Sequence, residues 1–279
     1  MPGGTSEAED RIFEYPVASI CSRYVCLGTH VGHMGIKHKI RKGLWRVGYD
    51  ICRFDHASHP LARRQRIFRH YEIDTVIDVG ANAGHFAQEL RMDIGYIGGI
   101  LSFEPLGDVF DLLEMNAKND PNWKVFNFAL GDNNEKREIN RSENSLSSSL
   151  LEMLPSHLES APNSKYVAKQ MIEIRTLDSI FDEVCKGSGN IYMKIDTQGF
   201  ESKVLKGSEC AMEKIDTIQM EMSLIPLYGG EVLFEDMCAV MRGKGYSLIA
   251  IENGFSSPES GQLLQVDGIF RRLARDERV

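Results

Sequence analysis

The sequence has neither a long hydrophobic run nor closely spaced cysteines. No stretch of eighteen apolar residues occurs, and the first thirty residues have no apolar core of the kind found in signal peptides. The six cysteines include no Cys-x-x-Cys pair, which argues against a metal site or a disulfide framework. We therefore expect a soluble, cytoplasmic protein without a metal, and leave open a peripheral position at a membrane surface.

Charge is distributed unevenly along the chain. Its 279 residues have a formal net charge of −8, but residues 23–70 contain eleven Lys or Arg and two acidic residues, a net charge of +9. With 42% hydrophobic residues, the chain is long enough to bury one sizeable core. We divide it into a basic helical N-terminal extension, residues 1–70, and a globular domain, residues 71–279.

Apolar residues recur at helical spacing in the basic extension. They are Ile36, Ile40, Leu44, Val47 and Ile51. This spacing predicts one helix from Ile36 to Ile51 with lysines and arginines on much of its remaining surface, and a second basic helix from Leu61 to Tyr71. Two interpretations stay open. The helices pack on their own domain or on the second subunit of a homodimer, or they contact an anionic or lipid-linked partner. No nucleic-acid recognition motif accompanies the charge.

After Tyr71, apolar β-branched runs alternate with helical stretches. The predicted strands are Thr75–Gly80, Ile100–Glu104, Trp123–Leu130, Met171–Ile174, Ile191–Ile195, Thr217–Met222, Tyr246–Glu252 and Leu264–Phe270. The predicted helices are 84–92, 107–118, 177–184, 201–205 and 233–244. This alternation predicts an α/β fold with a doubly wound, Rossmann-like and mostly parallel sheet, whose last strands form an antiparallel edge. The Ser-rich stretch 141–169 is interpreted as an inserted loop, with a short helix near Ser149–Met153.

A glycine-containing turn follows the first strand of this domain. Gly80 and Gly84 let the backbone turn tightly against a ligand, and Asn82 tolerates left-handed conformations. Asp78 precedes the turn; its carboxylate repels a pyrophosphate but attracts a sulfonium or an ammonium. The turn therefore favours S-adenosyl-L-methionine over a dinucleotide.

Two further segments complete this predicted cofactor site. Glu104 ends the next strand about twenty residues after the turn, where a doubly wound fold places an acid beside a ribose. Ala129 is small enough for backbone groups to face an adenine edge, and Leu130 is expected to pack on its ring.

Charged residues also end two later strands. Lys194 and Asp196 alternate with apolar residues in a strand that should be apolar throughout if it is central, which indicates a specific role. Glu221 reaches the end of the following strand. Its alternative role is an ion pair with Lys194.

Taken in order, these segments resemble the FkbM family of class I methyltransferases. The resemblance extends over Ile73 to Phe270 and includes VIDVGANAG, FEP, Thr176–Asp178 and KIDTQGFE. It implies that residues 71–279 are an S-adenosylmethionine-binding methyltransferase domain that transfers a methyl group to a hydroxyl of a sugar, glycolipid or natural product. The family's usual KIDVEG is here KIDTQG, so Gln198 replaces a glutamate and no charged role is assigned to it.

The resemblance also implies roles in the transfer itself. A hydroxyl acceptor must lose its proton, and Asp196 is our first choice either for the base or for a group that orients the acceptor, with Glu221 and His85 as further catalytic candidates. Ser147 and Ser148 lie in the segment Ser145–Leu150, which matches a substrate-side loop of the family and could line the acceptor pocket; the other interpretation of this segment is a flexible linker. Three alternatives stay open: a nicotinamide-dependent oxidoreductase, a non-catalytic cofactor-binding module, and metal-assisted methyl transfer through Asp196 or Glu221.

Overall fold

The computed structural model describes residues 31–272. The chain divides into two compact units, Met1–Cys52 and Arg53–Val279. The first thirty residues of the predicted extension lie outside the described residues. None of the helices within 31–272 combines the length and apolar composition that crossing a bilayer requires.

In the described part of the first unit, residues 31–52, the structure has one helix, α1 (Val31–Trp45). The sequence predicted this helix over Ile36–Ile51, and its end was wrong. Gly48 has a φ of +82°, outside the helical range, and a turn joins the Tyr49 N–H to the Leu44 carbonyl. Val47 and Ile51 therefore lie beyond the helix.

Helix α2 (Pro60–His70) belongs to the second unit. Its Ile67 and Phe68 are buried in a core cluster with Tyr192 of the sheet, and the Phe68 and Tyr192 rings lie 4.7 Å apart. The compact units thus divide between Cys52 and Arg53, whereas the predicted boundary lies after residue 70. Because α2 is rich in basic residues, nothing in the sequence indicated that Ile67 and Phe68 attach this helix to the second unit.

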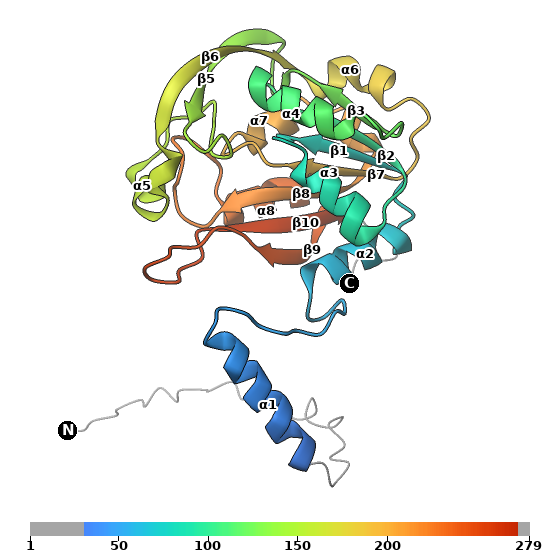
Figure 1. The fold of residues 1–279 in the computed structure, drawn as a ribbon. Helices are drawn as coiled ribbons and strands as arrows, with labels where there is room; N and C mark the ends of the chain where they lie inside the picture. Colours follow the sequence, from blue (N-terminus) through green and yellow to red (C-terminus); the bar gives the residue numbers. More distant parts are fainter. Residues whose placement is uncertain (1–30, 273–279) are drawn as a thin grey trace, which may run out of the picture. The chain divides into compact units, whose positions relative to one another are not determined.

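The remaining elements of the second unit follow one another as helices and strands (Figure 1). The strands of its main sheet are β1 (Thr75–Val79), β2 (Gly99–Phe103), β3 (Trp123–Phe126), β7 (Ile191–Ile195), β8 (Ile215–Ser223), β9 (Tyr246–Asn253) and β10 (Gln265–Arg272). The helices are α3 (His85–Glu89), the π-helix η1 (Leu90–Ile94), α4 (Gly107–Ala117), α5 (Pro155–Ser160), the 3₁₀ turns η2 (Pro162–Ser164) and η3 (Ala211–Lys214), α6 (Leu177–Val184), α7 (Glu201–Lys206) and α8 (Phe234–Gly243).

The seven strands are arranged in the order β3-β2-β1-β7-β8-β10-β9. Strands β1, β2, β3, β7 and β8 are parallel, and β10 is antiparallel to both β8 and β9. This confirms the predicted doubly wound α/β fold with an antiparallel edge. Chain order reverses between β1 and β7, the position at which such sheets bind ligands beyond their carboxyl ends.

Helices cover both faces of the sheet. Alternate strand residues face opposite sides, so Val76 packs with α2 and α3 in one core cluster, whereas Ile77 packs with α6, α7 and α8 in the other. Strand β1 is buried along its whole length, which holds the turn that follows it in a fixed position.

A second sheet has the order β4-β6-β5, formed by β4 (Ala129–Leu130), β5 (Glu135–Ser142) and β6 (Tyr166–Arg175). Figure 1 shows β5 and β6 as a long curved pair beside the main sheet. The predicted strand Trp123–Leu130 is therefore two strands in different sheets. The short helix predicted near Ser149–Met153 was also wrong: both end residues form β-bridges, and the helix of this region is α5.

Candidate active site

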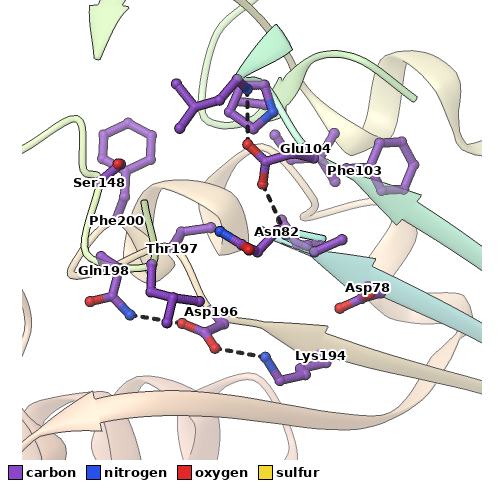
Figure 2. Close-up of a pocket in the computed structure, with 18 of the residues that line it drawn as sticks. Asp78, Asn82, Phe103, Glu104, Ser148, Lys194, Asp196, Thr197, Gln198 and Phe200 are labelled. Atoms are coloured by element: carbon purple, nitrogen blue, oxygen red, sulfur yellow. Dashed lines mark hydrogen bonds and ion pairs between the residues drawn. The ribbon is translucent and has the colours of Figure 1, made fainter. Parts of the chain in front are cut away.

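A cavity of about 300 Å³ lies at the carboxyl ends of β1, β2 and β7 (Figure 2). Its volume is at the lower end of the range for small-molecule sites. The residues that line it come from the glycine turn, from the tips of β1, β2, β7 and β8, from β4, and from the segment after β5. The fold thus brings the predicted carboxylates Asp78, Glu104, Asp196 and Glu221 to one space.

The turn between β1 and α3 requires its glycines. Gly80 has a φ of +78°, and a Cβ there would lie 1.9 Å from the Asp196 carbonyl oxygen. Gly84 has a φ of +86°, and its Cβ would lie 2.7 Å from the Trp123 ring. Asn82 adopts a φ of +48°. The turn can therefore pack this closely against Asp196 and Trp123 only with glycine at positions 80 and 84.

Asp78 is fully buried at the end of β1. Its Oδ2 accepts a hydrogen bond of 3.0 Å from the Ser102 hydroxyl, and within residues 31–272 its Oδ1 is buried without a partner. Burial raises the pKa of Asp78 to about 6, an effect that the charge of Lys194 partly offsets. A buried carboxylate oxygen without a partner is costly in a native structure, so it indicates a ligand group.

Glu104 follows β2 and holds the turn in place. Its Oε2 accepts from the Asn82 N–H at 2.9 Å, and its Oε1 accepts from the Leu106 N–H at 2.8 Å. Burial raises the pKa of Glu104 to about 7, although these two bonds act against it. Because each carboxylate oxygen has two lone pairs, Glu104 can still accept from a ligand.

Ala129 and Leu130 also line the cavity, as predicted, but they do so from β4 of the second sheet. Phe103 at the end of β2 lines the same side. This combination of small, aliphatic and aromatic side chains provides an apolar surface for a ring.

Asp196 lies on the opposite wall, just past the end of β7. Its Oδ2 accepts from Lys194 Nζ at 2.8 Å, and its Oδ1 accepts from Gln198 Nε2 at 2.9 Å (Figure 2). Burial acts to raise the pKa of Asp196, but the charge of Lys194 and these two hydrogen bonds outweigh it and lower the pKa below its ordinary value. Asp196, and not Glu221, is therefore the ion-pair partner of Lys194.

Gln198 joins the two carboxylates of this wall. Its Nε2 donates to Asp196 Oδ1 and to Glu221 Oε2, both at 2.9 Å. Its Oε1 accepts from the Tyr228 hydroxyl at 2.6 Å, which fixes the orientation of the amide. The sequence indicated no role for Gln198; its position two residues after Asp196 and directly before Gly199 was the available signal.

Glu221 approaches the same network from β8. Its Oε2 accepts from Gln198 and, at 2.9 Å, from Gln265 Nε2. Its Oε1 accepts no hydrogen bond from the described residues. Burial and the neighbouring charge of Asp196 raise the pKa of Glu221 well above its ordinary value.

The segment between β5 and α5 covers part of the cavity. Ser148 lines it, as predicted, whereas Ser147 is buried away from it and donates to Ser164 at 3.0 Å. Ser145, the first residue of the segment predicted to line the acceptor pocket, also lines the cavity and accepts from Asn82 Nδ2 at 3.3 Å. His85 lies exposed at the start of α3 and also lines the cavity.

The residues of this cavity fit S-adenosylmethionine, which combines a sulfonium, an ammonium and a ribose. Asp78 offers a buried oxygen without a partner, the turn at Gly80 leaves no room for a Cβ, and Glu104 retains lone pairs. Carboxylates at both walls favour a cationic ligand.

The family comparison agrees with this arrangement. The model of the methyltransferase FkbM domain matches residues 78–248, more than half of the chain. The chain belongs to the FkbM methyltransferase family. Its cofactor is accordingly S-adenosylmethionine, as predicted, and the alternative assignment to nicotinamide-dependent oxidoreductases is set aside.

Three solved structures illustrate the likeness in fold. The FkbM methyltransferase from Methylobacillus flagellatus is 14% identical over 71% of this chain, with a TM-score of 0.41, and the match spans 44% of its own length. Fibrillarin from Aeropyrum pernix, solved with bound S-adenosyl-L-methionine, is 8% identical over 71% of this chain and 66% of its own, with a TM-score of 0.41. The mitomycin 7-O-methyltransferase is 10% identical over 76% and 54%, also with a TM-score of 0.41. Comparison with curated proteins gave no match.

Proposed function

We propose that this protein is an O-methyltransferase that acts on a hydroxyl of a sugar, glycolipid or natural product. The observation that carries the proposal is the second carboxylate pair. Beside the two carboxylates that suit the cofactor, the cavity has Asp196 and Glu221, which Gln198 holds together. Methylation of a hydroxyl requires a proton acceptor in addition to the cofactor, and a carboxylate can provide one.

S-adenosylmethionine supplies, when bound, an electrophilic methyl group. Asp78 and Glu104 would hold its charged and ribose portions at the tips of β1 and β2. Ala129 and Leu130 would contact its adenine. Because positioning of the reactants supplies much of the acceleration in a displacement of this kind, these contacts matter for rate as well as for binding.

In this proposal Glu221 accepts the proton of the acceptor hydroxyl. The proton would move to Oε1, the carboxylate oxygen that accepts no bond from the described residues. The acceptor oxygen would bond to the methyl carbon as the bond between that carbon and sulfur breaks, so that the cofactor leaves as a neutral thioether. Both oxygens of Asp196 already accept bonds, and its lowered pKa makes it a weak base. Asp196, the first choice from sequence, is therefore assigned to orient the acceptor.

The acceptor side of the cavity suits a neutral polyol. Ser145 and Ser148 present hydroxyls, which both donate and accept hydrogen bonds. Two carboxylates on the facing wall disfavour an acceptor with a phosphate or carboxylate next to the reacting hydroxyl. His85 lies exposed without a hydrogen-bond partner among the described residues, so nothing fixes it as a base.

The test is incubation of the full-length protein with S-adenosylmethionine labelled on the methyl group and with extracts of the producing cells, followed by mass spectrometry. We expect label on an oxygen of a hydroxylated product, both with and without EDTA. Label on nitrogen or carbon would contradict O-methylation. Cofactor binding without any labelled product would favour the alternative of a non-catalytic module, and loss of labelling in EDTA would favour a metal-assisted reaction.

A further inference from the structure

Residues 38–52 expose an unusual number of large apolar side chains. These side chains are Ile40, Trp45, Val47, Tyr49 and Ile51, each between 49% and 71% exposed. Clusters of exposed apolar side chains of this kind mark binding surfaces. The segment lies outside the cavity, and the proposed methyl transfer does not use it.

The helix in this segment is marginal without a surface to bind. Helix α1 has 15 residues, a length at which an isolated helix is barely stable in water. Ile40 and Leu44 are four residues apart and therefore lie on one side of it. Leu44 is half-buried and Ile40 is 56% exposed. Burial of this side in an apolar environment would stabilise the helix.

Cations surround these apolar side chains. Residues 38–52 contain Lys39, Arg41, Lys42 and Arg46 against a single acid, Asp50. Arg41 pairs with Asp50 at 2.6 Å, and Lys39, Lys42 and Arg46 have no acidic partner among the described residues. The whole chain has a net charge of −8, so this segment has the opposite sign.

Aromatic residues in the segment suit the boundary between water and lipid. Trp45 is half exposed, and the Arg41 guanidinium lies 5.4 Å from its ring centroid. Tyr49, four residues later, is exposed as well. Tryptophan and tyrosine place an apolar ring and a polar group at the headgroup level, and lysine and arginine extend their charges toward lipid phosphates.

We propose that residues 38–52 bind the surface of an anionic membrane. The apolar side chains would enter the headgroup boundary, and the unpaired cations would contact anionic headgroups. A nucleic acid would satisfy the cations alone and leave the apolar side chains in water. A membrane surface satisfies both sets of groups.

The test is flotation of the full-length protein with vesicles of phosphatidylcholine containing one-third phosphatidylglycerol, compared with vesicles of phosphatidylcholine alone. We expect binding to the anionic vesicles that weakens as salt is raised. The triple variant Lys39→Gln, Lys42→Gln, Arg46→Gln should bind about a hundredfold more weakly, from the contribution of each cation near an anionic surface.

A matched control has the same change of charge elsewhere. Lys118, Lys124 and Lys186 are exposed and have no ion-pair partner among the described residues. Their triple replacement by Gln should leave vesicle binding within about twofold, since they lie outside the proposed surface. Equal loss in both triple variants would overturn the proposal, because it would indicate a response to overall charge.

Fluorescence provides a second readout. The chain has two tryptophans, and Trp123 is buried whereas Trp45 is not. Anionic vesicles should shift the emission to shorter wavelength, and Trp45→Phe should remove that shift while binding persists. The proposal would be overturned if the emission spectrum does not shift or if the wild-type protein does not float with the anionic vesicles. It would also be overturned if the protein binds no vesicles but forms a dimer that Trp45→Ala dissociates. None of these measurements requires methyl transfer.

Discussion

The two walls of the cavity hold their carboxylates in different ways. On the cofactor side, main-chain N–H groups of Asn82 and Leu106 bond Glu104, and Asp78 lies in a strand buried along its whole length. On the acceptor side, the groups that hold Asp196 and Glu221 are all side chains: Lys194, Gln198 and Gln265. On the first wall, main-chain groups therefore hold Glu104, and the Ser102 hydroxyl donates the one hydrogen bond that Asp78 accepts from the described residues. On the second wall, single substitutions can change every group that holds the two carboxylates.

The largest expected effect is on the acceptor side. Glu221→Gln keeps the size of the side chain but removes the proposed proton acceptor, so methyl transfer should fall by roughly 10²–10⁴-fold. Affinity for S-adenosylmethionine should change little. The measurement is the rate of labelled product formation with saturating cofactor. The control is Glu183→Gln, which replaces an exposed acid that has no ion-pair partner among the described residues. If Glu221→Gln loses affinity for the cofactor but keeps its rate at saturating cofactor, Glu221 would have a role in cofactor binding and not in proton transfer.

On the cofactor side, Glu104→Ala should weaken S-adenosylmethionine binding by about a hundredfold or more. The variant loses the carboxylate to which the two ribose hydroxyls of the cofactor would each donate a hydrogen bond. Isothermal titration calorimetry measures this directly. Glu114, exposed on α4, provides the matched control. Unchanged affinity in Glu104→Ala would break the distinction between the walls.

Protein stability should respond to pH in opposite directions at Asp78 and at Asp196. Burial raises the pKa of Asp78 to about 6, so its folded form holds a proton more tightly than its unfolded form, and stability is lost as pH rises through 6. Asp78→Asn should therefore stabilise the cofactor-free protein at pH 8 by up to roughly 3 kcal/mol, with the difference vanishing near pH 4.

Asp196 has a lowered pKa, so its contribution to stability is present above its unfolded pKa and disappears as pH falls. Asp196→Asn should consequently destabilise the protein at pH 8. Thermal unfolding of both variants across pH 4–8 tests the pair. A change in stability of the same sign in both variants at pH 8 would contradict the contrast between Asp78 and Asp196.

The smallest effect is expected at Gln198. An ionised glutamate there cannot donate to Asp196 and Glu221, so Gln198→Glu should slow transfer about tenfold at pH 8. A protonated glutamate donates again, and the rate relative to wild type should recover toward pH 6. Tyr228→Phe keeps both N–H donors and should have a smaller effect that does not vary with pH. A deficit in Gln198→Glu that is the same at all pH values would indicate a purely structural role.

The sequence predicted the cofactor wall better than the acceptor wall for a physical reason. Strands β1 and β2, which end at this wall, are buried and mostly apolar, and the turn residues Gly80 and Gly84 have a local sequence signature. The acceptor wall depends on contacts between distant residues: Gln198 reaches Glu221 across 23 positions and Tyr228 across 30. No local pattern encodes such contacts.

Strand β5 of the second sheet and the cavity-facing serines after it could not be predicted from the local sequence either. Strand β5 has the sequence EKREINRS, whose charged residues face solvent, so it gave no apolar alternation. The sequence could not show which of Ser145, Ser147 and Ser148 face the cavity, because the course of the backbone decides the direction of each side chain. The left-handed φ of Ser145 and the packing of Ser147 against Ser164 made that selection.

A crystal structure of the protein with S-adenosylmethionine tests the central claim most directly. The account predicts ribose hydroxyls within hydrogen-bond distance of Glu104, the cationic portion of the ligand near Asp78, and Glu221 Oε1 left facing an open acceptor space. A ribose bound to Asp196 or Glu221, with Glu104 contacting only main-chain N–H groups, would contradict the account.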